Sequence, residues 1–242
     1  MGFQVMSNLM RTGDYDDRFL TSYGAKLMET ERKLTGNGEH ENAAWQHRGP
    51  DAWLNRIGED SGNDPLAGYL KGLSNSPDAA TDFFNEEYVS KEDSPFERDT
   101  DDNGKNGKIP LSNFQYLFEE REWPQETNFK GDDDNTGRNN LALALEAATT
   151  GHPAGELPTV DTPAHNEEQT KLFESIVASV ADDNERLTKH NYMGDSIGQI
   201  TSEYLPDINR AMTNDSDGET DSCSPSPAAQ PRSTIVMSML CC

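Results

Sequence analysis

The sequence predicts an all-α fold: an irregular bundle of about seven to nine helices, with long acidic loops and a disordered C-terminal tail. Three observations predict it. Apolar residues recur at helical spacing in several windows that begin and end at capping residues. No window alternates apolar and polar residues over the length of a strand. From Asn214 the composition shifts to Ser, Pro, Asp and Gly, which is typical of disorder.

The first strong helix lies in DYDDRFLTSYGAKLMETERKL. Phe19, Tyr23 and Leu27 follow one another at i, i+4 and i+8, with Leu20 and Met28 beside them, so they predict the apolar stripe of an amphipathic helix. Asp14 or Asp16 can cap its start and Gly36 can end it. Residues 36–63 read as a polar loop, in which Trp53, Leu54 and Ile57 favour a short helix opened by Pro50.

Two helices follow in the next thirty or so residues. DPLAGYLKGLS places Leu66, Tyr69, Leu70 and Leu73 on one face. NSPDAATDFFN carries the clearest start signal, because Ser76 is placed to cap the helix and Pro77 stands at its first position. Residues 90–110 are expected to form an acidic loop.

The second half of the chain repeats this alternation of helix and loop. LSNFQYLFEERE predicts a helix that stops at Trp123-Pro124, and NNLALALEAATTG predicts one that stops at Gly151. NEEQTKLFESIVASVADD predicts another. A further helix from about Asn191 is expected to be interrupted by Pro206, which would start a short final helix.

These segments predict one helical domain over residues 1–212, with 124–138 as the place for any subdivision, and a disordered tail over 213–242. The aromatic residues of the predicted helices are expected to face the core, although an exposed groove for a partner helix is the alternative. They are Phe83, Phe84, Phe114, Phe118, Trp123 and Phe173.

The net charge of −24 excludes a nucleic-acid partner, which needs a basic surface. No stretch approaches the about 20 apolar residues of a membrane-spanning helix. Residues 1–35 are an exception to the acid excess, with five acidic and five basic residues. We therefore expect a protein partner, or the remainder of a larger chain, to dock on the neutral segment 1–35, and the acid excess elsewhere to keep the core soluble.

All three cysteines, Cys223, Cys241 and Cys242, lie in the last 20 residues, so neither a disulfide framework nor a zinc site is expected to hold the fold. The N-terminus lacks a basic region followed by an apolar stretch, as a secretory signal would have. A cytoplasmic location is the expectation, with export by a route that needs no signal peptide left open.

One string resembles a metal loop. In DTDDNGKNGKIP, Asp99, Asp101 and Asn103 stand where an EF-hand places its first three calcium ligands, and Gly104 stands at the sharp turn. Position 12, normally a bidentate Glu, is Pro110. A solvated acidic turn is therefore the preferred interpretation, and calcium binding here and in the loop 132–137 is the alternative.

No catalytic or cofactor motif is present. The sequence has no HExxH, GxSxG, phosphate-binding GxxxxGK or dinucleotide-binding GxGxxG string. Paired carboxylates such as Glu119-Glu120 and Glu167-Glu168 suit the polar faces of helices, since acid–base catalysis needs a pocket that shifts a pKa. We expect no enzyme and no cofactor, and an enzyme with a site that the sequence does not reveal stays an alternative.

A family resemblance adds to this. LMRTGDYDDRFLTSYGAKLMETERK, DPLAGYLKGLSNSPDAATDFFN, NFQYLFEEREWP, LALALEAATTGHP and DSIGQITSEYLPDINRAM occur in this order. Together, over about residues 7–212, they resemble an internal helical region of large uncharacterised actinobacterial proteins, of the kind found in streptomycetes. The resemblance transfers no functional residue. It implies a truncated or frame-shifted fragment, or a short stand-alone version, and its layout is similar to proteins of type VII secretion and toxin systems.

The function expected from all of this is a non-enzymatic helical interaction or scaffold module. The calcium-responsive acidic protein and the unrecognised enzyme are the two alternatives.

Overall fold

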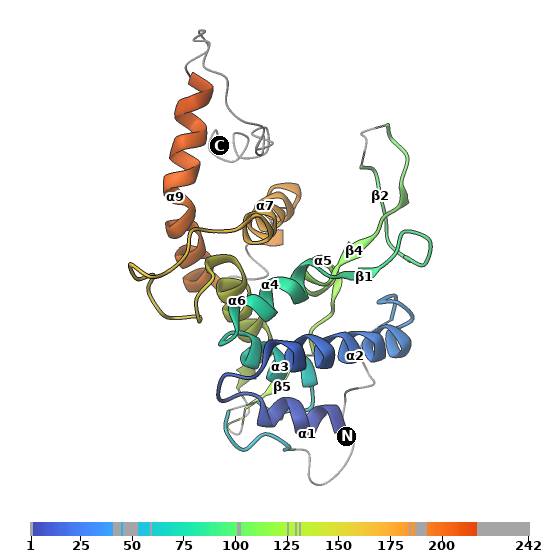
Figure 1. Ribbon diagram of the computed structural model, residues 1–242. Coiled ribbons are helices and arrows are strands. Elements are labelled where there is room, and N and C mark those ends of the chain that lie inside the picture. The colour runs from blue at the N-terminus through green and yellow to red at the C-terminus, as the bar shows by residue number, and fades with distance from the viewer. Residues whose placement is uncertain are drawn as a thin grey trace.

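The structure is a computed structural model, and it confirms the predicted all-α class. It describes residues 2–40, 45, 53–58, 60–100, 103–124, 126–128, 130, 132–183, 185–186 and 193–216. Within these ranges the chain forms eight α-helices, one π-helix and three two-stranded antiparallel sheets. The helices form the body, while the strands are two or three residues long and lie in the connections (Figure 1).

The first helices lie side by side at one end of the molecule (Figure 1). Helix α1 spans Gly2–Leu9 and helix α2 spans Asp17–Thr35. The predicted ends of α2 are confirmed: the Asp16 carboxylate accepts a hydrogen bond from the Phe19 amide, and Gly36 ends the helix with φ +60°. This positive φ is the left-handed conformation that glycine adopts without strain.

The buried face of α2 is the side of the predicted apolar stripe that carries Leu20 and Met28, rather than the side that carries Phe19 and Tyr23. Leu20, Leu27 and Met28 are buried, whereas Phe19 is 37% exposed and Tyr23 is half-buried. The inward face also includes Glu31, a charged residue with a side chain fully removed from solvent. A stripe defined by apolar residues alone therefore missed part of the inward face.

Helix α3 spans Pro65–Leu73 and packs closely on α1. A Cβ on Gly68 would lie 2.5 Å from the Ser7 carbonyl oxygen, so only glycine allows this approach of the two backbones. Helix α4 spans Pro77–Asn85 with Pro77 at its first position, as predicted. Ser76 does not cap it through its side chain, because its hydroxyl contacts the Asp14 carboxylate instead, at 3.1 Å.

Helix α6, Thr136–Thr150, is the central element and contacts α3, α4, α7 and α9. Its small side chains permit this: Ala144, Ala147 and Ala148 are all buried. It ends at Gly151 with φ +75°, as predicted. The six aromatic residues expected in the core are all buried, from Phe83 to Phe173.

The connections contain short strands that the sequence does not predict. Strands β1, Glu87–Val89, and β4, Leu111–Ser112, pair with each other and enclose the hairpin of β2, Glu97–Arg98, and β3, Gly107–Lys108. Strands β5, Glu126–Thr127, and β6, Asp133–Asp134, pair within the loop before α6. Such strands are too short for an alternating pattern to reveal them.

The helix predicted to stop at Trp123-Pro124 ends earlier and changes type. Helix α5, Asn113–Gln115, begins at a capping box of Ser112 and Gln115 and continues as the π-helix η2, Tyr116–Glu120. The prediction of a short helix around Trp53, Leu54 and Ile57 is wrong, since residues 53–58 have no regular secondary structure. There the Asn55 side chain accepts hydrogen bonds from the amides of Ile57 and Gly58 and replaces the helical pattern.

Helices α7, Glu167–Asp182, and α9, Gly194–Ser216, complete the fold. The prediction that Pro206 interrupts the last helix is wrong, because α9 continues through it. The apolar stripe survives on both sides of the proline: Ile200 and Tyr204 are buried before it, and Ile208 packs on the core after it. These contacts offset the hydrogen bond that a proline removes.

The predicted tail over 213–242 is described only to Ser216, where α9 ends, and its cysteines lie outside the described residues. None of the helices in the described part has the length and apolar character needed to cross a bilayer.

Candidate functional site

The calcium-like string lies at the tip of the β2–β3 hairpin. The Asp99 carboxylate accepts hydrogen bonds from the amides of Asn103, at 3.1 Å, and Gly104, at 2.6 Å. The Asn103 side chain accepts from the Lys105 amide at 2.9 Å, and Asp101 lies outside the described residues. The described oxygens thus close a turn, which is the role that Asp and Asn commonly play in hairpins.

The second loop is similar. One oxygen of Asp134 accepts from both the amide and the hydroxyl of Thr136, at 3.2 and 2.7 Å, and so supports the start of α6. Among the residues that the structure describes, no group of three or more His, Cys, Asp or Glu side chains is arranged to hold a metal ion.

The paired carboxylates belong to ion pairs or helix ends. Glu119 and Glu120 on η2 both contact the guanidinium of Arg98 from the β2–β3 hairpin. Glu167 and Glu168 stand in the first turn of α7, where the helix dipole favours negative charge.

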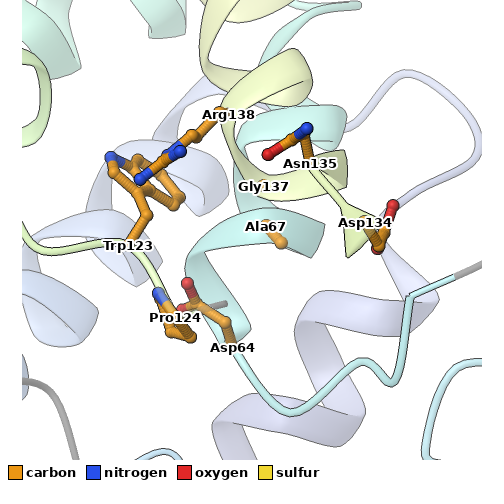
Figure 2. Close-up of a pocket in the computed structure, with 8 residues that line it drawn as sticks. All are labelled: Asp64, Ala67, Trp123, Pro124, Asp134, Asn135, Gly137 and Arg138. Atoms are coloured by element: carbon orange, nitrogen blue, oxygen red, sulfur yellow. The ribbon is translucent and has the colours of Figure 1, made fainter. Parts of the chain in front are cut away.

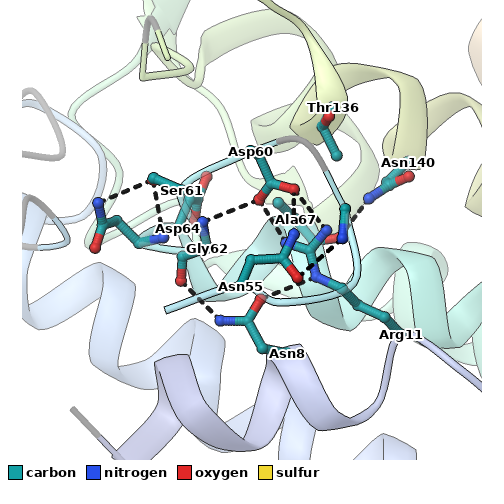
Figure 3. A network of polar contacts seen from close by, with 12 residues as sticks. Asn8, Arg11, Asn55, Asp60, Ser61, Gly62, Asp64, Ala67, Thr136 and Asn140 are labelled. Atoms are coloured by element: carbon teal, nitrogen blue, oxygen red, sulfur yellow. Dashed lines mark hydrogen bonds and ion pairs between the residues drawn. The ribbon is translucent and has the colours of Figure 1, made fainter. Parts of the chain in front are cut away.

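A buried polar cluster fastens α1 to the loop 53–64 (Figure 3). The Arg11 guanidinium donates to both oxygens of Asp60, at 2.8 and 2.6 Å, and its Nε donates to Asn8 at 2.9 Å. The side chains of Arg11 and Asp60 are only 5% and 2% exposed. The Asn55 amide and the Gly62 backbone amide also donate to Asp60, at 2.7 and 3.1 Å. The buried Arg11 guanidinium thus links the end of α1 to the carboxylate of this loop through charge-assisted hydrogen bonds.

A second buried cluster joins α2, α3 and the residue that follows η2. Arg121 donates to Glu31 through Nε at 2.8 Å, and through its two Nη atoms to the two oxygens of Asp64 at 3.0 and 3.1 Å. Its guanidinium lies 4.3 Å from the Trp123 ring. Glu31 also accepts from the Tyr116 hydroxyl at 3.1 Å. These contacts make the cluster a structural junction, since each group is partnered in the fold.

The electrostatics of this junction follow from its burial. Removal from water raises the pKa of Asp64, and the charge of Arg121 opposes that rise. The neighbouring Asp64 and Glu31 raise the pKa of Arg121 above its ordinary value despite burial, so it remains charged. Burial likewise raises the pKa of Tyr116.

A small cavity adjoins the junction (Figure 2). It is about 20 Å³ in volume and is lined by side chains that include Asp64, Trp123, Asp134 and Arg138. Figure 2 shows the Arg138 side chain beside the Trp123 ring. This volume is enough for about one water molecule, so the cavity is no substrate pocket.

The outer face of α1 and the start of α2 leave apolar side chains in solvent. Val5 and Leu9 are 49% and 60% exposed, and Phe19 is 37% exposed. Tyr15 and Tyr23 lie beside Phe19, with ring centroids 6.3 and 6.0 Å away, and the Tyr15 hydroxyl donates to the Leu9 carbonyl at 3.0 Å. We call these five residues the α1–α2 surface.

No protein-family model, curated protein or solved structure matches this chain. Function is therefore argued from the side chains and their surroundings.

Sequence reasoning did not identify the two buried clusters. One signal was available: Glu31 follows Leu27 by four residues and Met28 by three, so an acidic residue lies on the apolar stripe of α2. A charge at such a position needs a buried partner. That partner is Arg121, which lies 90 residues further along the chain, so no local pattern in the sequence identifies it.

Proposed function

We propose that this chain is a non-enzymatic helical interaction module, and that the α1–α2 surface binds the apolar face of a helix from a partner protein. One observation carries the proposal: the apolar side chains exposed on α1 and α2 lie in segment 1–35, which is charge-balanced in a chain with net charge −24. Burying exposed apolar area is the main driving force of most protein associations.

A partner of different sequence fits better than a second copy. Two copies would each carry a charge of −24, and like charges of this size repel at close approach. The α1–α2 surface itself is held in place from beneath, because α1 is fixed to α3 and to the loop 53–64. A surface held in this way loses little conformational entropy on binding.

The membership in a larger actinobacterial protein and the link to type VII secretion or toxin systems stay proposals. They rest on the sequence resemblance over residues 7–212. The described oxygens of the loop 99–104 are engaged in a turn, so no second function is proposed from them.

The experiment compares matched charge substitutions on the full chain. Purified proteins encoded beside this gene are titrated against the wild type, the double variant Leu9→Glu/Phe19→Glu, and the control Leu34→Glu, which also alters an exposed apolar residue of α2. We expect the double variant to weaken binding by about tenfold or more, and the control to change it little.

Circular dichroism checks that each variant folds, and light scattering gives the oligomeric state. Equal affinity of the double variant and the wild type contradicts the proposal. A partner-independent dimer that the double variant dissociates also contradicts it, since the surface would then bind a second copy.

A further inference from the structure

A cavity lies between the segment 157–165 and helix α9. Its volume is about 530 Å³, within the range of about 300–1,000 Å³ that is usual for small-ligand sites. Leu157, Pro158 and Pro163 line it on one side, and Pro206 lines it from α9. We call it the α9 pocket.

The rim of the α9 pocket is apolar and open to solvent. Leu157, which lines the pocket, is 74% exposed, and Pro158, Pro163 and Pro206 line it as well. Exposed apolar side chains gathered around a cavity are typical of a surface that binds another polypeptide.

Two carboxylates line the pocket from α9. Glu203 and Asp207 are four residues apart and so lie on the same side of the helix. The Glu203 side chain is 9% exposed and is fixed by Gln199, which donates to it at 2.7 Å, and by His152, whose Nε2 lies 3.0 Å from it. Glu203 is thus a positioned group.

Asp207 is the more accessible of the two. It is 52% exposed and contacts Arg210 at 3.2 Å, and Arg210 is 70% exposed. An exposed ion pair one turn apart contributes little to stability and exchanges readily with another cation. The Asp207 carboxylate can therefore exchange Arg210 for a cationic ligand with little loss of stability.

The remaining charge-bearing group of the pocket is His165. Its ring stacks on Tyr204 with centroids 4.1 Å apart, and Tyr204 stacks in turn on Phe173 at 4.1 Å. Burial lowers the pKa of His165 from the ordinary 6.5, although Glu203 and Asp207 oppose this. Its imidazole is neutral at pH 7, so among the described lining residues, which include no Lys or Arg, the charges are those of Glu203 and Asp207.

We propose that the α9 pocket binds an arginine or lysine side chain from a basic segment of a partner protein. The aliphatic stem lies against Leu157, Pro158 and Pro163, and the cationic group contacts Asp207 and Glu203. Long basic side chains combine an apolar stem with a charged end, which matches the two kinds of wall. The net charge of −24 also attracts a basic segment over a distance.

This inference extends the proposed function to a second surface and does not depend on the α1–α2 surface. The α9 pocket is lined by residues of 157–165 and 199–207, and none of the α1–α2 surface residues lines it. A negative result for one surface therefore leaves the proposal for the other surface unaffected.

The test uses the full chain and two peptides that differ in charge alone. An acetylated and amidated peptide with one arginine between glycines is titrated at low salt, followed by amide NMR shifts, and compared with the same peptide carrying neutral citrulline. We expect the arginine peptide to shift amides in 157–165 and 199–207, with an affinity about tenfold or more above that of the citrulline peptide. Free arginine amide should bind more weakly than the peptide, because it lacks the flanking backbone that meets the apolar rim.

Two single substitutions provide the matched control. Asp207→Asn removes the accessible carboxylate, and Asp195→Asn removes another exposed acidic residue of the same helix, outside the pocket. We expect a severalfold loss of affinity for the first variant and no change for the second. Equal binding of the two peptides, unchanged binding by Asp207→Asn, or shifts outside the pocket would overturn the proposal, as would the absence of any shift at millimolar peptide.

Discussion

Replacing Arg121 by methionine is the most informative test of how the fold is held together. Methionine is similar in length and keeps an apolar contact with the Trp123 ring, but it removes three hydrogen bonds and the cation that contacts both Glu31 and Asp64. The Arg121, Glu31 and Asp64 side chains are 1%, 0% and 4% exposed, so water cannot replace the lost partner.

The magnitude follows from this burial. Removing one member of a buried ion pair typically costs about 3–5 kcal/mol, because the remaining charge is left unpaired. Each kcal/mol lowers the melting temperature by about 2–4 °C in a protein of this size. We therefore expect Arg121→Met to lower the free energy of unfolding by about 3–5 kcal/mol and the melting temperature by about 6–20 °C.

The loss should depend on pH, with a sign set by Asp64. Burial already raises its folded-state pKa above the ordinary 3.8, so the folded state binds a proton more readily than the unfolded state. The tighter binding of a proton by Asp64 in the folded state stabilises the fold below pH 3.8, and this stabilisation is lost as the pH rises through the folded-state pKa. Without Arg121 the folded-state pKa rises further, so the variant should lose more stability at pH 7.5 than at pH 5.

Urea unfolding of both proteins at the two pH values, followed by tryptophan fluorescence and circular dichroism, measures this. Arg121→Met/Asp64→Asn is the control, because it removes one of the stranded charges and should recover part of the stability. A loss under about 1 kcal/mol, the size expected of an exposed pair, would refute the reasoning. So would a loss that is the same at pH 5 and pH 7.5.

Three further predictions concern other parts of the molecule. Asp60→Asn leaves Arg11 without its carboxylate and should cost about 3 kcal/mol; hydrogen exchange should then be fastest in α1, and unchanged exchange there would contradict it. Gly68→Ala should destabilise by about 1–3 kcal/mol, since its Cβ would lie 2.5 Å from Ser7. Gly198→Ala, in open space on α9, should stabilise by up to about 1 kcal/mol; thermal melts that rank the two alike would count against the close packing of α1 on α3. Millimolar Ca²⁺ should leave the melting temperature unchanged, because Asp99 is engaged in a turn; a rise that Asp99→Asn abolishes would instead favour the calcium hypothesis.

Elements with local signals could be predicted from the sequence. The ends of α2 are marked by Asp16 and Gly36, and the end of α6 by Gly151, because capping depends on residues within one turn. The apolar spacing likewise placed the core aromatic residues correctly.

Features that depend on distant residues could not be predicted. Two of the groups that donate to Glu31, on Tyr116 and Arg121, stand 85 and 90 residues further on, and the walls of the α9 pocket come from two segments that meet only through the packing of α9. The helix continues through Pro206 because Tyr204 and Ile208 pack on either side, which a local rule about proline does not include.

The π-helix η2 has a consequence for tolerated changes in chain length. The Arg121 amide donates to the Tyr116 carbonyl five residues earlier, at 2.7 Å, so this turn holds one residue more than an α-helical turn. Deleting one residue between 116 and 120 would allow this turn to revert to the α-helical repeat, which has one residue fewer. The same deletion in a regular α-helix would instead rotate the following residue by about 100°. A one-residue deletion in η2 should therefore displace Arg121 from Glu31 and Asp64 less than such a deletion in an α-helix would, although most side chains of 113–121 are buried and should tolerate substitution poorly.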